Sequence, residues 1–77
     1  MIYTKKIDDY SKLEIELDEN GFGCLMEIYS KGDVYEVERI TDLWINYEGF
    51  NGVEYDEKIS ITEENFLKEI FKNTRKL

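Results

Sequence analysis

The sequence predicts an α+β fold, an antiparallel meander sheet of about five strands followed by one C-terminal helix that packs on one face of the sheet. Apolar and polar residues alternate along most of residues 2–61, which is the period of half-buried strands. Gly, Asn and Asp cluster between the alternating runs, as they do in tight turns. The period becomes helical at about residue 62. A small, partly closed barrel plugged by the helix is the alternative.

The first two strands flank a polar turn. Residues 2–7 are expected to form the first strand, and residues 8–11 (Asp-Asp-Tyr-Ser) the turn that follows it. Residues 13–17 alternate most regularly, with three apolar side chains on one face and Glu14 and Glu16 on the other. This strand is therefore expected to lie half-buried in the sheet.

A hairpin is expected at Asn20-Gly21, because this pair favours the positive φ angles of a tight turn. Residues 23–29 then form the returning strand, with Cys24, Met26 and Ile28 on one face. This alternation predicts that Cys24 is a small core residue.

The later strands are separated by further turns. Residues 30–33 form a turn, and residues 35–39 alternate again. Residues 42–47 follow, with Leu43, Ile45 and Tyr47 on one side. Asn51-Gly52 is a second hairpin signal, and residues 53–61 form one strand or two short ones.

The helix is expected over about residues 62–76. Thr62 is a candidate N-cap, and Ser60 with Glu63 is a candidate capping box that begins earlier. Apolar residues at helical spacing form one face, and basic residues occupy the last turns, where the helix dipole favours cations. The apolar face contains Phe66, Leu67, Ile70 and Phe71, and the basic residues are Lys68, Lys72, Arg75 and Lys76.

The composition argues against an enzyme. With 77 residues the chain forms a single domain, residues 1–77. It contains no histidine and one cysteine, so histidine-based acid–base catalysis, a Cys–His nucleophile and a multi-cysteine zinc site are all excluded. No glycine pattern matches a nucleotide-binding loop. We therefore expect no catalytic residue, no metal and no cofactor.

Because no signal peptide, membrane span or disulfide is indicated, we expect a cytoplasmic protein that does not bind a membrane.

The charge is strongly negative and unevenly spread. The formal net charge is −8, from 18 acidic and 10 basic residues. Residues 68–77 carry four basic residues and one acidic residue, so the remaining 67 residues hold a local charge of −11. A polyanion does not bind nucleic acid, because affinity there comes from neutralising phosphates. We therefore expect a basic protein partner.

The carboxylates suggest where this partner binds. Glu14 and Glu16 project from one face of their strand, and Glu36 and Glu38 from one face of theirs. Residues i and i+2 on a strand lie about 6.6–6.8 Å apart, close to the interval between successive phosphates of an extended nucleic acid. The alternative is an ordinary solvated sheet face. Further acidic residues expected to continue this surface are Asp18, Glu19, Glu54, Asp56 and Glu57.

Trp44 is the remaining candidate binding residue. It lies on the opposite face of its strand from Leu43 and Ile45. An exposed Trp beside carboxylates would be a strong anchor, because Trp dominates interface hot spots. Alternatively, the face assignment is inverted and Trp44 packs under the helix.

These observations predict a stoichiometric inhibitor that masks a basic nucleic-acid-binding or active site on a partner, such as a nuclease, by nucleic-acid mimicry. Phage-encoded inhibitors of restriction or CRISPR nucleases are small acidic proteins of this type. Immunity proteins and antitoxins that neutralise a basic toxin are the alternative, because they also block a basic site. An oligomerisation module that associates through an exposed sheet edge or an apolar Trp44 patch is the other alternative, so the protein is expected to be a monomer or a homodimer.

Overall fold

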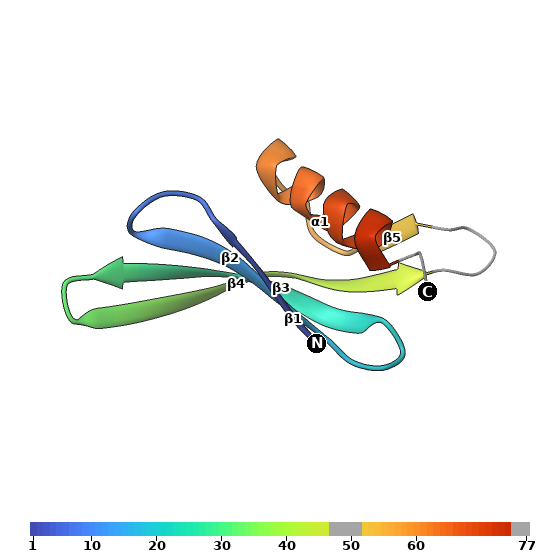
Figure 1. The fold of residues 1–77 in the computed structure, drawn as a ribbon, viewed down its shortest axis with the longest axis horizontal. Coiled ribbons are helices and arrows are strands. Elements are labelled where there is room, and N and C mark those ends of the chain that lie inside the picture. The colour runs from blue at the N-terminus through green and yellow to red at the C-terminus, as the bar shows by residue number, and fades with distance from the viewer. Residues whose placement is uncertain (47–51, 75–77) are drawn as a thin grey trace.

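The computed structural model describes residues 1–46 and 52–74. Five antiparallel strands form one sheet in the order β1-β2-β3-β4-β5, and helix α1 follows the last strand (Figure 1). The predicted α+β meander with a C-terminal helix is confirmed. The elements are β1 (Ile2–Lys6), β2 (Ser11–Leu17), β3 (Phe22–Lys31), β4 (Val34–Asn46), β5 (Gly52–Tyr55) and α1 (Ile61–Thr74).

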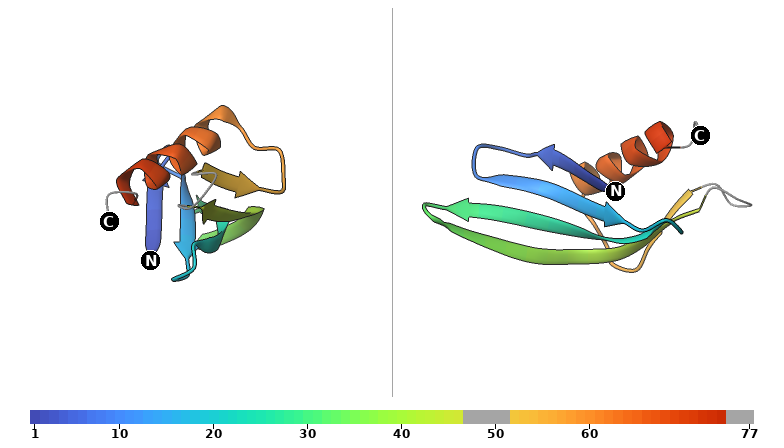
Figure 2. Two further views of the ribbon diagram at one scale, coloured as in Figure 1. Left: turned by 90° about the vertical axis from the view of Figure 1, so that its right-hand side faces the viewer. Right: turned by 60° about the horizontal axis from the view of Figure 1, so that its bottom comes forward.

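The sheet curls around the helix and leaves its other face uncovered. Figure 2 shows α1 lying on the concave side of the curled sheet. The strand order keeps β1 and β5 at opposite edges, so the sheet is open rather than a closed barrel. We call the side that carries α1 the inner face and the opposite side the outer face. The core between sheet and helix consists of Leu13, Ile15, Leu17, Leu25, Leu43, Ile45, Phe66, Leu67 and Ile70.

The helix begins at the predicted capping box. The backbone N–H of Ser60 donates to Glu63 Oε1 at 2.8 Å, and the N–H of Glu63 donates to Ser60 Oγ at 3.2 Å. These two bonds satisfy backbone donors that a helix start leaves unpaired. Ser60, rather than Thr62, is therefore the N-cap. Arg75, Lys76 and Leu77 lie outside the described residues.

The buried face of strand β3 is the opposite of the one predicted. Leu25 pairs with Ile15 and is fully buried, so the odd-numbered residues of this part of β3 face the core. Cys24, Met26 and Ile28 lie on the outer face and are half-buried. The prediction that Cys24 is a core residue is wrong, because β3 carries apolar residues on both faces and periodicity alone does not identify the buried one.

The segments at 35–39 and 42–47 belong to one long strand interrupted by a β-bulge. Leu25 pairs with Thr41 but Met26 pairs with Arg39, so Ile40 is an extra residue without a cross-strand partner. An extra residue exchanges the two faces of a strand, because side chains alternate with period two. Glu36 and Glu38 therefore lie on the inner face, whereas Asp42 and Trp44 lie on the outer face.

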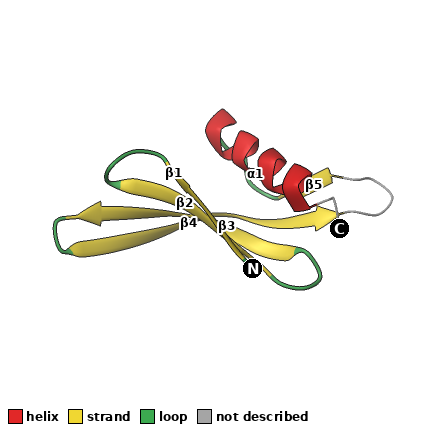
Figure 3. Ribbon diagram, viewed as in Figure 1, coloured by secondary structure: helices red, strands yellow, loops and turns green. Residues whose placement is uncertain are grey.

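The turn end of the β3–β4 hairpin extends beyond the helix. We call this end, residues 27–39, the arm. Its two-residue turn, Gly32-Asp33, contains Gly32 at a φ of 61°, and residues 31–39 are all exposed. The hairpin contributes to a longest molecular dimension of 44 Å. At the opposite end, β5 is a strand of only 4 residues, and residues 56–60 form a connection to α1 (Figure 3). Tyr47 and Asn51 lie outside the described residues.

Candidate protein interface

Trp44 lies on the outer face and stacks on Phe22. The two rings pair across β3 and β4, with centroids 5.3 Å apart and planes inclined by 8°. Phe22 is 52% exposed and Trp44 is half-buried. The alternative in which Trp44 packs under the helix is wrong, because Leu43 and Ile45 occupy that side. The stacked pair forms an accessible aromatic surface.

The turn at Asp18 to Gly21 holds this aromatic pair in place. Trp44 Nε1 donates to the Asn20 carbonyl at 3.3 Å, and the N–H of Phe22 donates to Asp18 Oδ1 at 3.0 Å. The N–H of Ile45 donates to the Gly21 carbonyl at 2.8 Å. The turn thus holds the Trp44 ring and the Phe22 backbone in place, so less conformational freedom is lost when a partner binds.

Carboxylates border the aromatic pair. Glu54 is the cross-strand partner of Trp44, and Asp42 lies two residues before Trp44 on the same face. Glu54 and Asp56 form no ion pair among the described residues, whereas Asp42 pairs with Arg39. An open hollow of about 470 Å³ is lined by Phe22, Asp42, Leu43, Trp44, Glu54, Tyr55 and Asp56. We call Phe22, Trp44, Asp42, Glu54 and Asp56 the aromatic–acidic surface.

Several other predicted residues lie next to this surface. Glu16 is paired with Cys24, which in turn is paired with Asp42, so Glu16 lies on the same face two strands away. Glu14 is paired with Met26 on that face, and Asp18 and Glu19 are exposed in the turn beside Phe22. Thus most of the predicted interface residues gather at one end of the outer face.

Glu36 and Glu38 lie elsewhere, on the inner face of the arm. The expectation that they continue one carboxylate surface with Glu14 and Glu16 is wrong, because the bulge at Ile40 places the two pairs on opposite faces. Glu57 also lies outside the hollow. Its backbone N–H donates to Thr41 Oγ1 at 3.1 Å, and its side chain is exposed.

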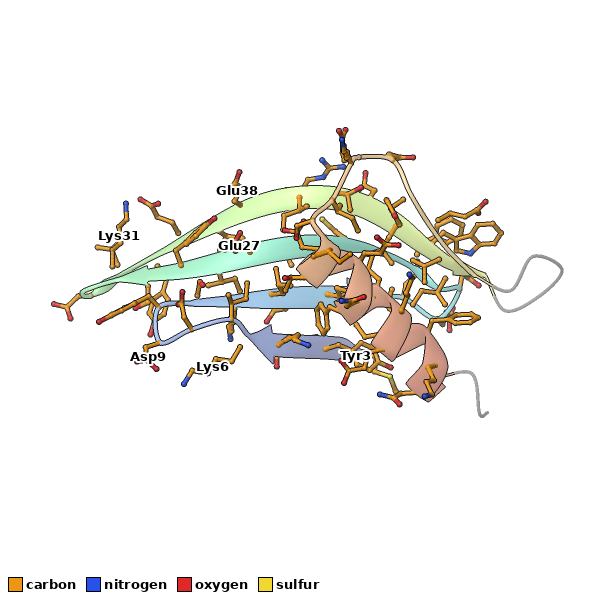
Figure 4. The ribbon with its side chains drawn as sticks, turned by 90° about the horizontal axis from the view of Figure 1, so that it is seen from above. Tyr3, Lys6, Asp9, Glu27, Lys31 and Glu38 are labelled. Atoms are coloured by element: carbon orange, nitrogen blue, oxygen red, sulfur yellow. The ribbon has the colours of Figure 1, made fainter. Side chains whose placement is uncertain are left out.

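Glu36 and Glu38 belong instead to a second acidic group, and their proximity to Glu27 was not predicted from the sequence. Glu27 on β3 pairs directly with Glu38 on β4 (Figure 4). Tyr29 pairs with Glu36. The Tyr29 hydroxyl donates to Glu38 Oε2 at 3.4 Å. The interaction with the neighbouring Glu27 carboxylate, desolvation and the charge of Glu38 raise the pKa of Tyr29 to about 12. These carboxylates form no ion pair among the described residues.

Recognising the aromatic–acidic surface requires the strand register. Phe22 is separated from Trp44 by 22 positions, and only the β3–β4 pairing brings the two rings together. The Asn20-Gly21 hairpin signal indicated the turn but not which residues pair beyond it. The acidity of the surface, in contrast, was readable from Asp42, Glu54 and Asp56.

The remaining reactive side chain is the thiol of Cys24. It is free and half-buried on the outer face, and desolvation raises its pKa, which disfavours the nucleophilic thiolate. Within residues 1–46 and 52–74, no cluster of three or more His, Cys, Asp or Glu side chains is arranged to hold a metal ion. In the same part of the chain, no helix is both long and apolar enough to cross a membrane.

Comparison with known proteins gives no further assignment: no family, no curated protein and no solved structure matches the chain.

Proposed function

We propose that this protein is a non-enzymatic, stoichiometric inhibitor that occupies a basic site on a partner protein through its aromatic–acidic surface. The observation that carries the proposal is the stacked Phe22–Trp44 pair, accessible on the outer face and bordered by Glu54 and Asp56. Cytoplasmic localisation accompanies the proposal, since a single half-buried cysteine needs no oxidising compartment.

The chemistry of the surface favours a cationic ligand. An Arg or Lys side chain over the face of a Trp ring gains a cation–π attraction of about 0.5–2 kcal/mol. Glu54 and Asp56 lack cationic partners among the described residues, so they are available to a guanidinium or ammonium group of another protein. Trp is also among the residue types that dominate binding energy at interfaces.

Long-range charge supports the same kind of partner. A net charge of −8 on a chain of 77 residues steers a basic protein toward the surface and repels nucleic acid. The nucleic-acid-binding groove of a nuclease and the active site of a basic toxin both have the required charge. Because the carboxylates do not form one row, recognition is proposed to depend on the aromatic anchor with flanking charges rather than on imitation of a phosphate backbone.

The test is affinity capture from the cells that encode the chain, with Glu54→Lys/Asp56→Lys compared with the wild-type protein. We expect a basic protein, bound in a 1:1 ratio, to be retained by the wild-type protein and lost with the variant. Asp9→Lys/Glu69→Lys is the matched control. It changes the net charge equally, and it replaces exposed residues whose surface ion pairs with Lys6 and Lys5 contribute little to stability.

The two variants separate local contact from overall charge. Retention of the partner by the control, together with its loss from the Glu54/Asp56 variant, supports the proposed surface. Equal retention by both variants, or equal loss from both, contradicts it. Circular dichroism of each variant establishes that the fold is intact before capture.

A further inference from the structure

The arm carries an unpaired strand edge. Strand β4 pairs with β5 only from Leu43 to Asn46, and the segment from Val34 to Arg39 pairs with β3 alone. In an antiparallel pair, alternate residues turn their N–H and C=O groups away from the partner strand. Within the described residues no backbone hydrogen bond joins this segment to anything but β3. The edge is therefore a template for one more strand.

The two faces of this edge differ in chemistry. On the outer face, Tyr35 and Val37 are 73% and 62% exposed. On the inner face, Glu36 and Glu38 lie next to Glu27 of β3 without a cationic partner among the described residues. An added strand would therefore meet apolar side chains on one face and carboxylates on the other, because its own side chains alternate in the same way.

We infer that the free edge of β4 binds an extended basic segment of a partner protein by β-strand addition. Lys or Arg at alternate positions would face Glu36, Glu38 and Glu27, and the intervening β-branched residues would contact Tyr35 and Val37. Main-chain hydrogen bonds supply affinity in this mode of recognition, and alternate side chains supply specificity. The inference concerns a different surface from the aromatic–acidic one and does not depend on it.

A second copy of the chain fits this edge poorly. Antiparallel pairing of two β4 edges brings Glu36 and Glu38 of one copy close to the same carboxylates of the other copy, with both Glu27 side chains nearby. Like charges opposite each other destabilise a strand pair. The edge therefore selects against self-association and favours a strand of opposite charge.

The probe for this inference is a synthetic peptide of alternating Lys and Val, about seven residues long, which is within the usual range of strand lengths. Titration into ¹⁵N-labelled protein is expected to shift the amide signals of residues 34–39 and to slow their hydrogen exchange. A peptide of the same sequence with alternate backbone amides N-methylated is the control for main-chain pairing. Glu36→Lys/Glu38→Lys is expected to weaken binding roughly tenfold or more, whereas Glu14→Lys/Glu16→Lys on β2 is expected to retain it.

Three results would overturn the inference. Equal binding of the N-methylated peptide would show that attraction is electrostatic only. Equal weakening by the two double variants would show that net charge, rather than the edge, determines affinity. Dimerisation of the protein alone, with protection of residues 34–39, would assign the edge to a second copy.

Discussion

Glu27 and Glu38 face each other directly across β3 and β4, and the Tyr29 hydroxyl on the same face donates to Glu38 at 3.4 Å. Two carboxylates in one cross-strand pair destabilise the arm, because like charges placed opposite repel. Neither carboxylate forms an ion pair among the described residues. The arrangement therefore has measurable consequences for titration and for stability.

The first consequence is the ionisation of Tyr29. Its pKa is raised from 10.0 to about 12, chiefly by the Glu27 carboxylate, and Glu38 adds to the shift. Since the folded-state pKa exceeds the unfolded-state value, this interaction stabilises the fold below pH about 10 and is lost as pH rises toward 12. Spectrophotometric titration of Glu27→Gln/Glu38→Gln should show one tyrosine ionising at lower pH than in the wild-type protein. The Tyr29→Phe variant identifies that tyrosine. Identical titration curves for the wild-type and Gln variants would show that Glu27 and Glu38 do not lie beside the Tyr29 hydroxyl.

The second consequence is a charge reversal that stabilises the protein. Glu38→Lys replaces a repulsive cross-strand pair with an attractive one and should raise the free energy of unfolding by up to about 1 kcal/mol. Urea denaturation measures the change. Glu14→Lys is the matched control, because Glu14 is paired with Met26 and gains no attraction across the strands. Glu38→Lys also removes the acceptor of the Tyr29 hydroxyl, so the comparison is made in the Tyr29→Phe background. A decrease in stability for Glu38→Lys in that background would contradict the repulsion between Glu27 and Glu38.

Gly21 is expected to be intolerant of a side chain. Its φ is 87°, and a Cβ atom there would lie 2.6 Å from the Ile45 carbonyl oxygen. Gly21→Ala should lower the free energy of unfolding by about 1–3 kcal/mol, because it adds a backbone clash to left-handed strain. Gly32→Ala is the control, since Gly32 has a φ of 61° but open space around it. Equal losses for the two variants would exclude the close approach between the turn and β4.

The capping box gives a similar paired comparison at the helix start. Ser60→Ala should cost about 1 kcal/mol of stability, because the Glu63 N–H loses its acceptor. Thr62→Ala should change stability much less, since Thr62 is exposed and forms no capping bond. Thermal denaturation compares the two variants. A larger effect at Thr62 than at Ser60 would place the N-cap two residues later.

Local patterns in the sequence were sufficient for the order and type of most elements, although β4 was predicted as two strands and residues 56–60 as part of a strand. The regular alternation of residues 13–17, the Asn20-Gly21 turn and the capping box at Ser60 each depend on neighbouring residues only. They therefore predicted strand β2, the β2–β3 hairpin and helix α1 correctly. Alternation within one strand also placed Trp44 opposite Leu43 and Ile45, but it left open which of these two faces the helix covers.

The errors arose where tertiary pairing decides the outcome. β3 has apolar side chains on both faces, so the buried Leu25 was not distinguishable from Cys24 or Met26. The bulge at Ile40 leaves no clear mark in the sequence, yet it moved Glu36 and Glu38 to the inner face. The stacking of Phe22 on Trp44 likewise depends on register between distant residues, which one sequence does not specify.

The most direct test of the central claim is the binding kinetics of the captured partner with the wild-type protein, Trp44→Ala and Glu54→Lys/Asp56→Lys. If the aromatic–acidic surface is the interface, Trp44→Ala should speed dissociation by about tenfold or more, since it removes the anchor. The charge reversal should slow association most at low ionic strength. Rate constants that stay at wild-type values in both variants, with both proteins folded, would contradict the account.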